Sequence, residues 1–169
     1  VICSDKTGTL TQNKMTVKKI FDGKKLSDDN LSEAGLMLLR LGALCGDGKV
    51  TLEYGKEISV GDPTETGIVS AAMKFCKQDK DELEAIYPRL AEVPFSSDRK
   101  LMTTVNMING KPFAVTKGAP DVLMKLCTGG NLGGAKKAVI DMGEEALRVI
   151  AVAIQPLETV PGNPTPENL

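Results

Sequence analysis

An aspartate directly after a short apolar run is the residue whose setting points most clearly to chemistry. Residues 1–3, Val-Ile-Cys, have the composition of a strand end, and Asp5 follows in the string Cys-Ser-Asp-Lys-Thr-Gly-Thr-Leu-Thr. In open α/β sheets, reactive groups lie where a strand ends at the carboxyl edge. There Asp5 could attack a phosphorus atom and carry it as an aspartyl phosphate. Gly8 allows a tight turn, and Thr7 places a hydroxyl where phosphate oxygens would lie.

The simpler interpretation of Asp5 is an Asx-type turn, in which the carboxylate caps its own loop. An isolated Asp-x-Thr-Gly would favour that interpretation. The unbroken string of nine residues favours a phosphate site instead.

Two later stretches combine residue types that suit a nucleotide. Residues 94–102, Pro-Phe-Ser-Ser-Asp-Arg-Lys-Leu-Met, bring a flat ring, Phe95, close to a cation, Lys100, as a purine and its phosphates require. Residues 115–121, Val-Thr-Lys-Gly-Ala-Pro-Asp, place Lys117 at a strand end beside Gly118, where a ligand can approach without meeting a Cβ. Taken singly, Phe95 could equally be a core residue and Lys117 a surface lysine.

Two more stretches are weaker signals when taken alone. Residues 61–66, Gly-Asp-Pro-Thr-Glu-Thr, contain a carboxylate, Glu65, that could either accept a hydrogen bond from an amino group or complete a capping box with Asp62. Residues 146–153, Ala-Leu-Arg-Val-Ile-Ala-Val-Ala, place Arg148 beside an apolar strand-like run. An arginine fork suits phosphate because it cannot lose its charge.

Together these stretches resemble a known family. The string Asp-Lys-Thr-Gly-Thr-Leu-Thr at residues 5–11, with Asn-Lys-Met-Thr-Val at 13–17, closely resembles the phosphorylation segment of P-type cation-transporting ATPases. The four later stretches resemble parts of that family's nucleotide site, in the family's order. Gly-Asp-Pro-Thr-Glu-Thr and Lys-Gly-Ala-Pro-Asp look most like bacterial members of the calcium-pump branch.

The resemblance implies a role for each matching residue. Asp5 would accept the γ-phosphoryl of ATP, with Asp5 and Thr7 holding magnesium. Adenine would lie against Phe95, near Glu65 and Met102. The phosphates would be surrounded by Lys100, Lys117 with its neighbour Gly118, and Arg148. The implied activity is ATP hydrolysis through an aspartyl phosphate, coupled to transport of a cation, most readily calcium.

Two alternatives stay open. In phosphohydrolases of the haloacid-dehalogenase type, a second aspartate acts as general acid and base at the position of Thr7, which cannot do so. This chain could still be such an enzyme with a cap domain. It could also be a nucleotide-binding module without catalysis, because the family's downstream magnesium-site motifs are absent from the sequence.

Composition narrows the functional classes. The net charge of −1 over 169 residues and the 4% aromatic content give no reason to expect a nucleic acid partner. Histidine is absent, which removes Ser-His and Cys-His catalysis. The four dispersed cysteines predict reduced, buried thiols.

No apolar run approaches the ~20 residues that span a bilayer. The resemblance then implies a monomeric cytoplasmic piece of an integral membrane protein, with the phosphorylation, actuator and transmembrane domains as its partners.

The expected fold is α+β, an antiparallel sheet flanked by helices. Strands are predicted at residues 15–21, 91–95, 100–108, 111–116 and 147–154, with a weak hairpin at 50–60. Asn-Gly at residues 109–110 predicts a hairpin turn between the strands at 100–108 and 111–116. Helices are predicted from Ser27 or Asp28 to Cys45, from about 62 to 77, and at 81–87, 120–127 and 136–146. Gly-Asp-Gly at residues 46–48 is expected to stop the first helix in a turn, and Asp62 before Pro63 is expected to begin the second. Residues 128–135 are expected to form a flexible loop.

The expected domain organisation has three parts. Residues 1–13 would belong to the phosphorylation domain, residues 14–155 would form the nucleotide-binding domain, and residues 156–169 would be a Pro-rich linker back to the phosphorylation domain.

Overall fold

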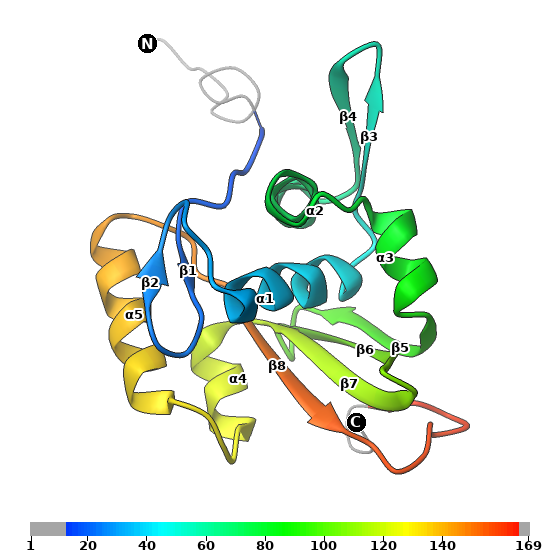
Figure 1. The fold of residues 1–169 in the computed structure, drawn as a ribbon. Coiled ribbons are helices and arrows are strands. Elements are labelled where there is room, and N and C mark those ends of the chain that lie inside the picture. Colours follow the sequence, from blue (N-terminus) through cyan, green and yellow to red (C-terminus); the bar gives the residue numbers. More distant parts are fainter. Residues whose placement is uncertain (1–12, 166–169) are drawn as a thin grey trace, which may run out of the picture.

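A four-stranded antiparallel sheet organises the second half of the chain. The structure, a computed structural model, describes residues 13–165, so Asp5 and Thr7 lie outside the described residues. The strands follow one another in the order of the sequence (Figure 1): β5 (Arg89–Ser96), β6 (Leu101–Ile108), β7 (Lys111–Gly118) and β8 (Ala151–Pro156).

The β6–β7 hairpin sets the register of this sheet. Asn109 and Gly110 both have positive φ, 51° and 76°, as a type I′ turn requires. From there the two strands pair without interruption, from Ile108 with Lys111 to Leu101 with Gly118. The hairpin predicted from Asn-Gly is therefore confirmed.

A bulge in β5 changes the alternation of its side chains. Val93 pairs with Thr103, and Ser96 pairs with Leu101, so two residues on β5, Pro94 and Phe95, lie opposite one residue on β6. Such an insertion re-aims a strand locally. Here it places Pro94 and Phe95 opposite Met102.

Helix α1 (Glu33–Leu44) lies between the sheet and the other helices of the first half (Figure 1). One side of α1 packs on the sheet through Leu41 and the adjacent Cys45, against Met102 and Val115. The other side belongs to a second core cluster, shared with α2 (Pro63–Cys76) and α3 (Lys80–Ile86). Because α1 contributes to both clusters, its position couples α2 to the sheet.

The remaining elements lie at the edges of this core. The hairpin of β3 (Lys49–Glu53) and β4 (Lys56–Val60) projects away from the body, and the short β1 (Ile20–Phe21) and β2 (Leu26–Ser27) lie near α5 (Figure 1). Helices α4 (Pro120–Leu126) and α5 (Leu132–Glu144) connect β7 to β8. The α+β class with antiparallel sheets is confirmed. Within residues 13–165, no helix is long and apolar enough to cross a membrane.

Several predicted boundaries were wrong. The strand predicted at 15–21 is reduced to Ile20–Phe21, and the first helix begins after Ser32, whose hydroxyl accepts from Gly35 N at 3.1 Å, rather than after Ser27 or Asp28. The loop predicted at 128–135 contains the start of α5, because the Asn131 side chain accepts from Gly134 N and caps the helix.

The cysteine prediction holds only in part. Cys45 is buried, whereas Cys76 and Cys127 are partly exposed, and all three are free thiols. The Cys45 thiol donates to the backbone oxygens of Met102 and Val115, at 3.4 and 3.2 Å. Burial raises the pKa of this thiol, so Cys45 is a neutral packing residue.

Two glycine-to-alanine changes are expected to act in opposite directions. Gly110→Ala places a side chain at φ +76° in the turn and should lower the free energy of unfolding by about 1 kcal/mol. Gly143→Ala, in α5 with open space around the new Cβ, should raise it by about 0.4–1 kcal/mol. Urea unfolding followed by circular dichroism measures both. Equal effects would contradict the assigned turn.

Candidate functional site

A row of side chains crosses one face of the sheet. Met102 on β6 pairs with Lys117 on β7, which pairs with Val152 on β8, and the bulged Pro94 and Phe95 complete the row on β5. Directly paired residues present their side chains on the same face. Met102 and Lys117 are buried, whereas Phe95 is 60% exposed. The row thus joins an open aromatic ring to a buried lysine.

Glu65, on helix α2, contacts this row through Lys117. Its Oε1 accepts from Lys117 Nζ at 2.9 Å, and its Oε2 accepts from the backbone N–H groups of Asp47 and Gly48 at 2.8 and 2.9 Å. The capping box predicted for Glu65 is therefore wrong. The Asp62 side chain does cap α2, but through Thr64 N, and the Glu65 carboxylate points to β7 instead.

The environment of Glu65 stabilises its charged form. Burial by itself would raise the pKa of this carboxyl, but the hydrogen bond and charge of Lys117, with the two backbone donors, outweigh burial and lower the pKa. The carboxylate and the ammonium form a partly buried ion pair at the centre of the site.

Glycines make room for this pair. A Cβ on Gly46 would lie 2.7 Å from both Glu65 Oε1 and Lys117 Nζ. A Cβ on Gly118 would lie 2.1 Å from the backbone oxygen of Lys100, and Gly118 has φ +159°. Backbone therefore excludes a larger residue at Gly118, whereas a larger residue at Gly46 would displace the ends of the Glu65 and Lys117 side chains.

Arg148 contacts the first turn of α2. Its Nη1 donates to Thr64 Oγ1 at 3.3 Å, and its charge helps to lower the pKa of Asp62, where hydrogen bonds from Thr64 outweigh the opposing effect of burial. The strand predicted at 147–154 would contain Arg148, but β8 begins only at Ala151, so that boundary was wrong. The guanidinium is exposed in the segment that leads into β8.

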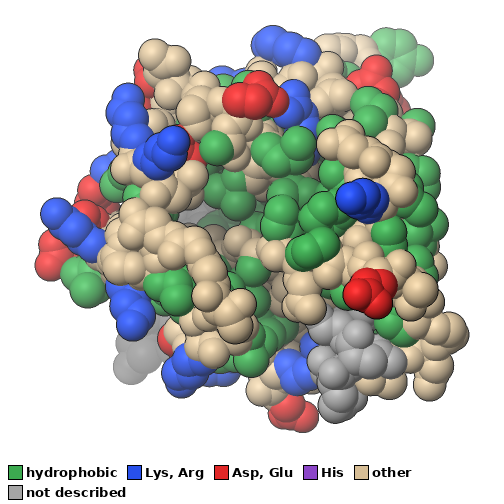
Figure 2. All heavy atoms as spheres, turned by 60° about the horizontal axis from the view of Figure 1, so that its bottom comes forward, with side chains coloured by type: hydrophobic (Ala, Val, Ile, Leu, Met, Phe, Trp, Pro, Cys, Tyr) green, Lys and Arg blue, Asp and Glu red, His purple; other side chains and the backbone are tan. Residues whose placement is uncertain are grey.

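The opposite face of the sheet carries a separate hollow of about 400 Å³. Its lining includes Thr103, Thr116 and the α4 residues Val122 and Leu126, and the two threonine hydroxyls lie 2.9 Å apart. Figure 2 brings the bottom of Figure 1 forward and shows hydrophobic side chains gathered on this side. Lys100 also lines this hollow, so the structure does not bring its side chain to Lys117.

The predicted residues therefore divide into groups. Strand pairing and one ion pair bring Glu65, Phe95, Met102 and Lys117 to one face. Gly118 follows Lys117 and pairs with Leu101, Arg148 adjoins the site through Thr64, and the backbone oxygen of Lys100 lies close to Gly118. Asp5 and Thr7 lie outside the described residues. Across residues 13–165, no group of three His, Cys, Asp or Glu side chains could hold a metal ion.

Sequence reasoning missed the contribution of residues 46–48, Gly-Asp-Gly. The sequence predicted only that these residues stop the helix and form a turn. In the structure, the backbone N–H groups of Asp47 and Gly48 also donate to the Glu65 carboxylate. Successive backbone N–H groups in a glycine-rich turn are a known way to bind an anion. The turn composition was a usable signal, but nothing in the sequence showed which carboxylate it would receive.

The Glu65 ion pair should make stability depend on pH. Because its pKa is lowered in the folded state, Glu65 contributes stability above its unfolded pKa of 4.5, and this contribution is lost as pH falls through the folded value. At pH 7 we expect the wild type to exceed Glu65→Gln by about 1–3 kcal/mol in free energy of unfolding, with the gap closing as pH falls below 4.5 and through the lower folded pKa. Urea unfolding across pH measures the gap, and a gap independent of pH would contradict the pairing.

Comparison with known proteins identifies a family and several relatives of this chain. Residues 36–167 match the model of a family described as P-type ATPase, cytoplasmic domain N. A calcium-transporting ATPase of Listeria monocytogenes is 40% identical to this chain, over 89% of the chain and 19% of its own length. A calcium-transporting ATPase of Bacillus cereus is 39% identical over 92% of the chain, and one of Lactococcus lactis is 38% identical over 93%.

The chain spans about a fifth of the length of these curated relatives. The family match covers most of the chain and runs from within α1 to beyond the end of β8. This chain belongs to the family of P-type ATPase cytoplasmic N domains.

Proposed function

We propose that this chain binds ATP on the sheet face that carries Met102 and Lys117, and that it presents the nucleotide for phosphoryl transfer within a longer cation-transporting ATPase. The observation that carries the proposal is the row from Phe95 through Met102 to Lys117, closed by Glu65. These four side chains come from three strands and a helix, and strand pairing and the Glu65–Lys117 hydrogen bond bring them to one face of the sheet.

The ion pair favours the purine end of the nucleotide. An exposed aromatic ring offers a stacking surface for a base. Because Glu65 and Lys117 largely neutralise each other, they suit an uncharged base, with a carboxylate to accept from the adenine amino group and an ammonium to donate to a ring nitrogen. We therefore place Lys117 at the adenine end, although the sequence placed it with the phosphates.

The phosphates would extend towards Arg148. Its guanidinium is exposed, and no acidic side chain of residues 13–165 lies within ion-pairing distance of it. A permanently charged fork can bind phosphate oxygens in two places at once. Lys100 keeps the phosphate role that the resemblance implies, and its exposed side chain at the edge of the sheet would have to turn towards this face.

The chemical step would use residues beyond this site. Asp5 would accept the γ-phosphoryl group of ATP. Magnesium would be held by Asp5 and Thr7, by the phosphates of ATP, and by carboxylates elsewhere in the longer protein. Magnesium would neutralise charge on those phosphates. The contribution of residues 14–155 would be to bind and position ATP, and residues 1–13 and 156–169 would connect them to the phosphorylation domain.

Calcium is the proposed cargo, because the relatives from Listeria, Bacillus and Lactococcus carry calcium-transporting in their names. The longer protein would lie in a membrane, with this domain on the cytoplasmic side and the phosphorylation, actuator and transmembrane domains as partners. By itself the chain would act as a monomeric binding module that does not turn ATP over.

Calorimetric titration of ATP and adenosine tests the proposed site. We expect saturable binding with a Kd of roughly 0.1–1 mM, little affected by magnesium. Phe95→Ala should weaken adenosine binding about tenfold or more because it removes the stacking surface. Lys117→Met should also weaken it, since it leaves Glu65 without its cation.

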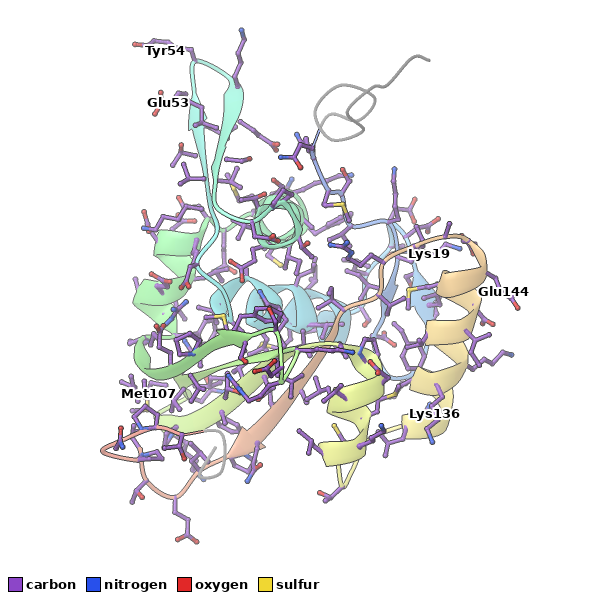
Figure 3. All side chains as sticks on the ribbon, turned by 180° about the vertical axis from the view of Figure 1, so that it is seen from behind. Lys19, Glu53, Tyr54, Met107, Lys136 and Glu144 are labelled. Carbon is purple, nitrogen blue, oxygen red and sulfur yellow. The ribbon has the colours of Figure 1, made fainter. Side chains whose placement is uncertain are left out.

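Tyr54→Ala is the matched control. Tyr54 lies at the far end of the β3–β4 hairpin and points away from the body (Figure 3), so its removal takes away an exposed ring without touching the row. Wild-type affinity is expected for this variant. Absent binding by a folded wild type, or equal losses in Tyr54→Ala and Phe95→Ala, would contradict the proposed site.

A further inference from the structure

Two cations lie behind the turn that holds Glu65. Lys80, at the start of α3, is 4% exposed, and its ammonium donates to the backbone oxygen of Gly46. Arg89, at the start of β5, donates from Nη2 to the backbone oxygens of Leu44 and Gly46, at 2.9 and 2.5 Å. Leu44 ends α1, so both cations lie where the helix dipole favours positive charge.

Arg89 also holds the side chain of the turn. Its Nη1 donates to Asp47 Oδ1 at 2.9 Å and to Glu92 Oε2 at 2.6 Å. One guanidinium therefore binds the end of α1, the backbone of Gly46 and the carboxylate of Asp47 together. The next contacts along the turn are the N–H groups of Asp47 and Gly48, which donate to Glu65.

Burying these two cations costs more free energy than forming an ion pair on the surface. Burial and the nearby charge of Arg89 both lower the pKa of Lys80, despite Glu84 at 3.7 Å. Within the described residues, the Nε atom of Arg89 is buried without a hydrogen-bond partner. Two close cations with an unsatisfied donor would be a poor way merely to end a helix, when one such residue or a glycine suffices.

We propose that Lys80 and Arg89 are positioning residues for Glu65: they fix residues 46–48 so that the amides of Asp47 and Gly48 hold one carboxylate oxygen and leave the other aimed at Lys117. A series of hydrogen bonds links these groups. The two cations bind Gly46 and Asp47, the turn that contains these residues binds Glu65, and Glu65 binds Lys117. Its effect on ligand affinity rests on the proposed function, in which Glu65 receives the adenine amino group.

The test compares three variants with the wild-type chain. Lys80→Met removes the ammonium and keeps the length of the side chain. Arg89→Lys keeps the charge, but a single ammonium cannot bind Leu44, Gly46 and Asp47 in the geometry of a guanidinium. Lys49→Met is the control, because Lys49 makes only an exposed pair with Asp81 in the same region.

Two readouts are measured on each variant: the pKa of the Glu65 carboxyl by carbon-13 NMR, and adenosine affinity by calorimetry. In Lys80→Met and Arg89→Lys, we expect the carboxyl pKa to rise towards its ordinary value and adenosine binding to weaken about threefold to tenfold. Lys49→Met should match the wild type in both.

A wild-type carboxyl pKa in both folded variants would overturn the proposal. Wild-type behaviour of Arg89→Lys, with a change only in Lys80→Met, would also overturn it, because charge alone would then account for the effect. If the wild type does not bind adenosine, the proposed function fails, and the carboxyl pKa still decides whether the two cations position Glu65.

Discussion

The site depends on one partly buried ion pair, Glu65 with Lys117. Removing two charges from water is costly, and mutual attraction offsets that cost only when the remaining hydrogen bonds are satisfied. Here Lys117 donates to one carboxylate oxygen, and the amides of Asp47 and Gly48 donate to the other. Gly46 leaves the space that the pair occupies. The pair joins α2, the turn after α1 and strand β7, which are far apart in the sequence, so the local fold and the site share the same contacts.

The sheet and α1 hold this pair from two sides. The register of β6 and β7, set by the type I′ turn at Asn109, places Met102 beside Lys117. Helix α1 packs over the same face through Leu41 and Cys45, and the turn at its end carries the two amides. Gly118 lets β7 end in contact with the Lys100 backbone. A nucleotide on this face would therefore contact a sheet held rigid by strand pairing. The charged groups of Glu65 and Lys117 would already be oriented before it binds.

Local signals in the sequence predicted what local chemistry controls. Asn-Gly predicted the hairpin, and Asp62 before Pro63 predicted the start of α2. The start of α5 was missed because Gly133 and Gly134 disfavour a helix, whereas burial of Ala138 and Met142 and the Asn131 cap stabilise it. For Glu65 the sequence left a capping box open beside a ligand role, because its spacing from Asp62 allows one. Its true partners come from residues 17, 18 and 52 positions away, which no local pattern could show.

The most direct test of the account is which face of the sheet receives ATP. Side chains alternate along β6 and β7, so Met102 and Lys117 lie on one face and Thr103 and Thr116 on the other, beside the hollow under α4. Nitrogen-15 NMR of the chain during an ATP titration separates the two. The account predicts the largest shifts at Phe95, Met102, Lys117 and Gly48, with Val122 and Leu126 nearly unchanged. Shifts concentrated at Thr103, Thr116, Val122 and Leu126 would place the nucleotide in the hollow and contradict it.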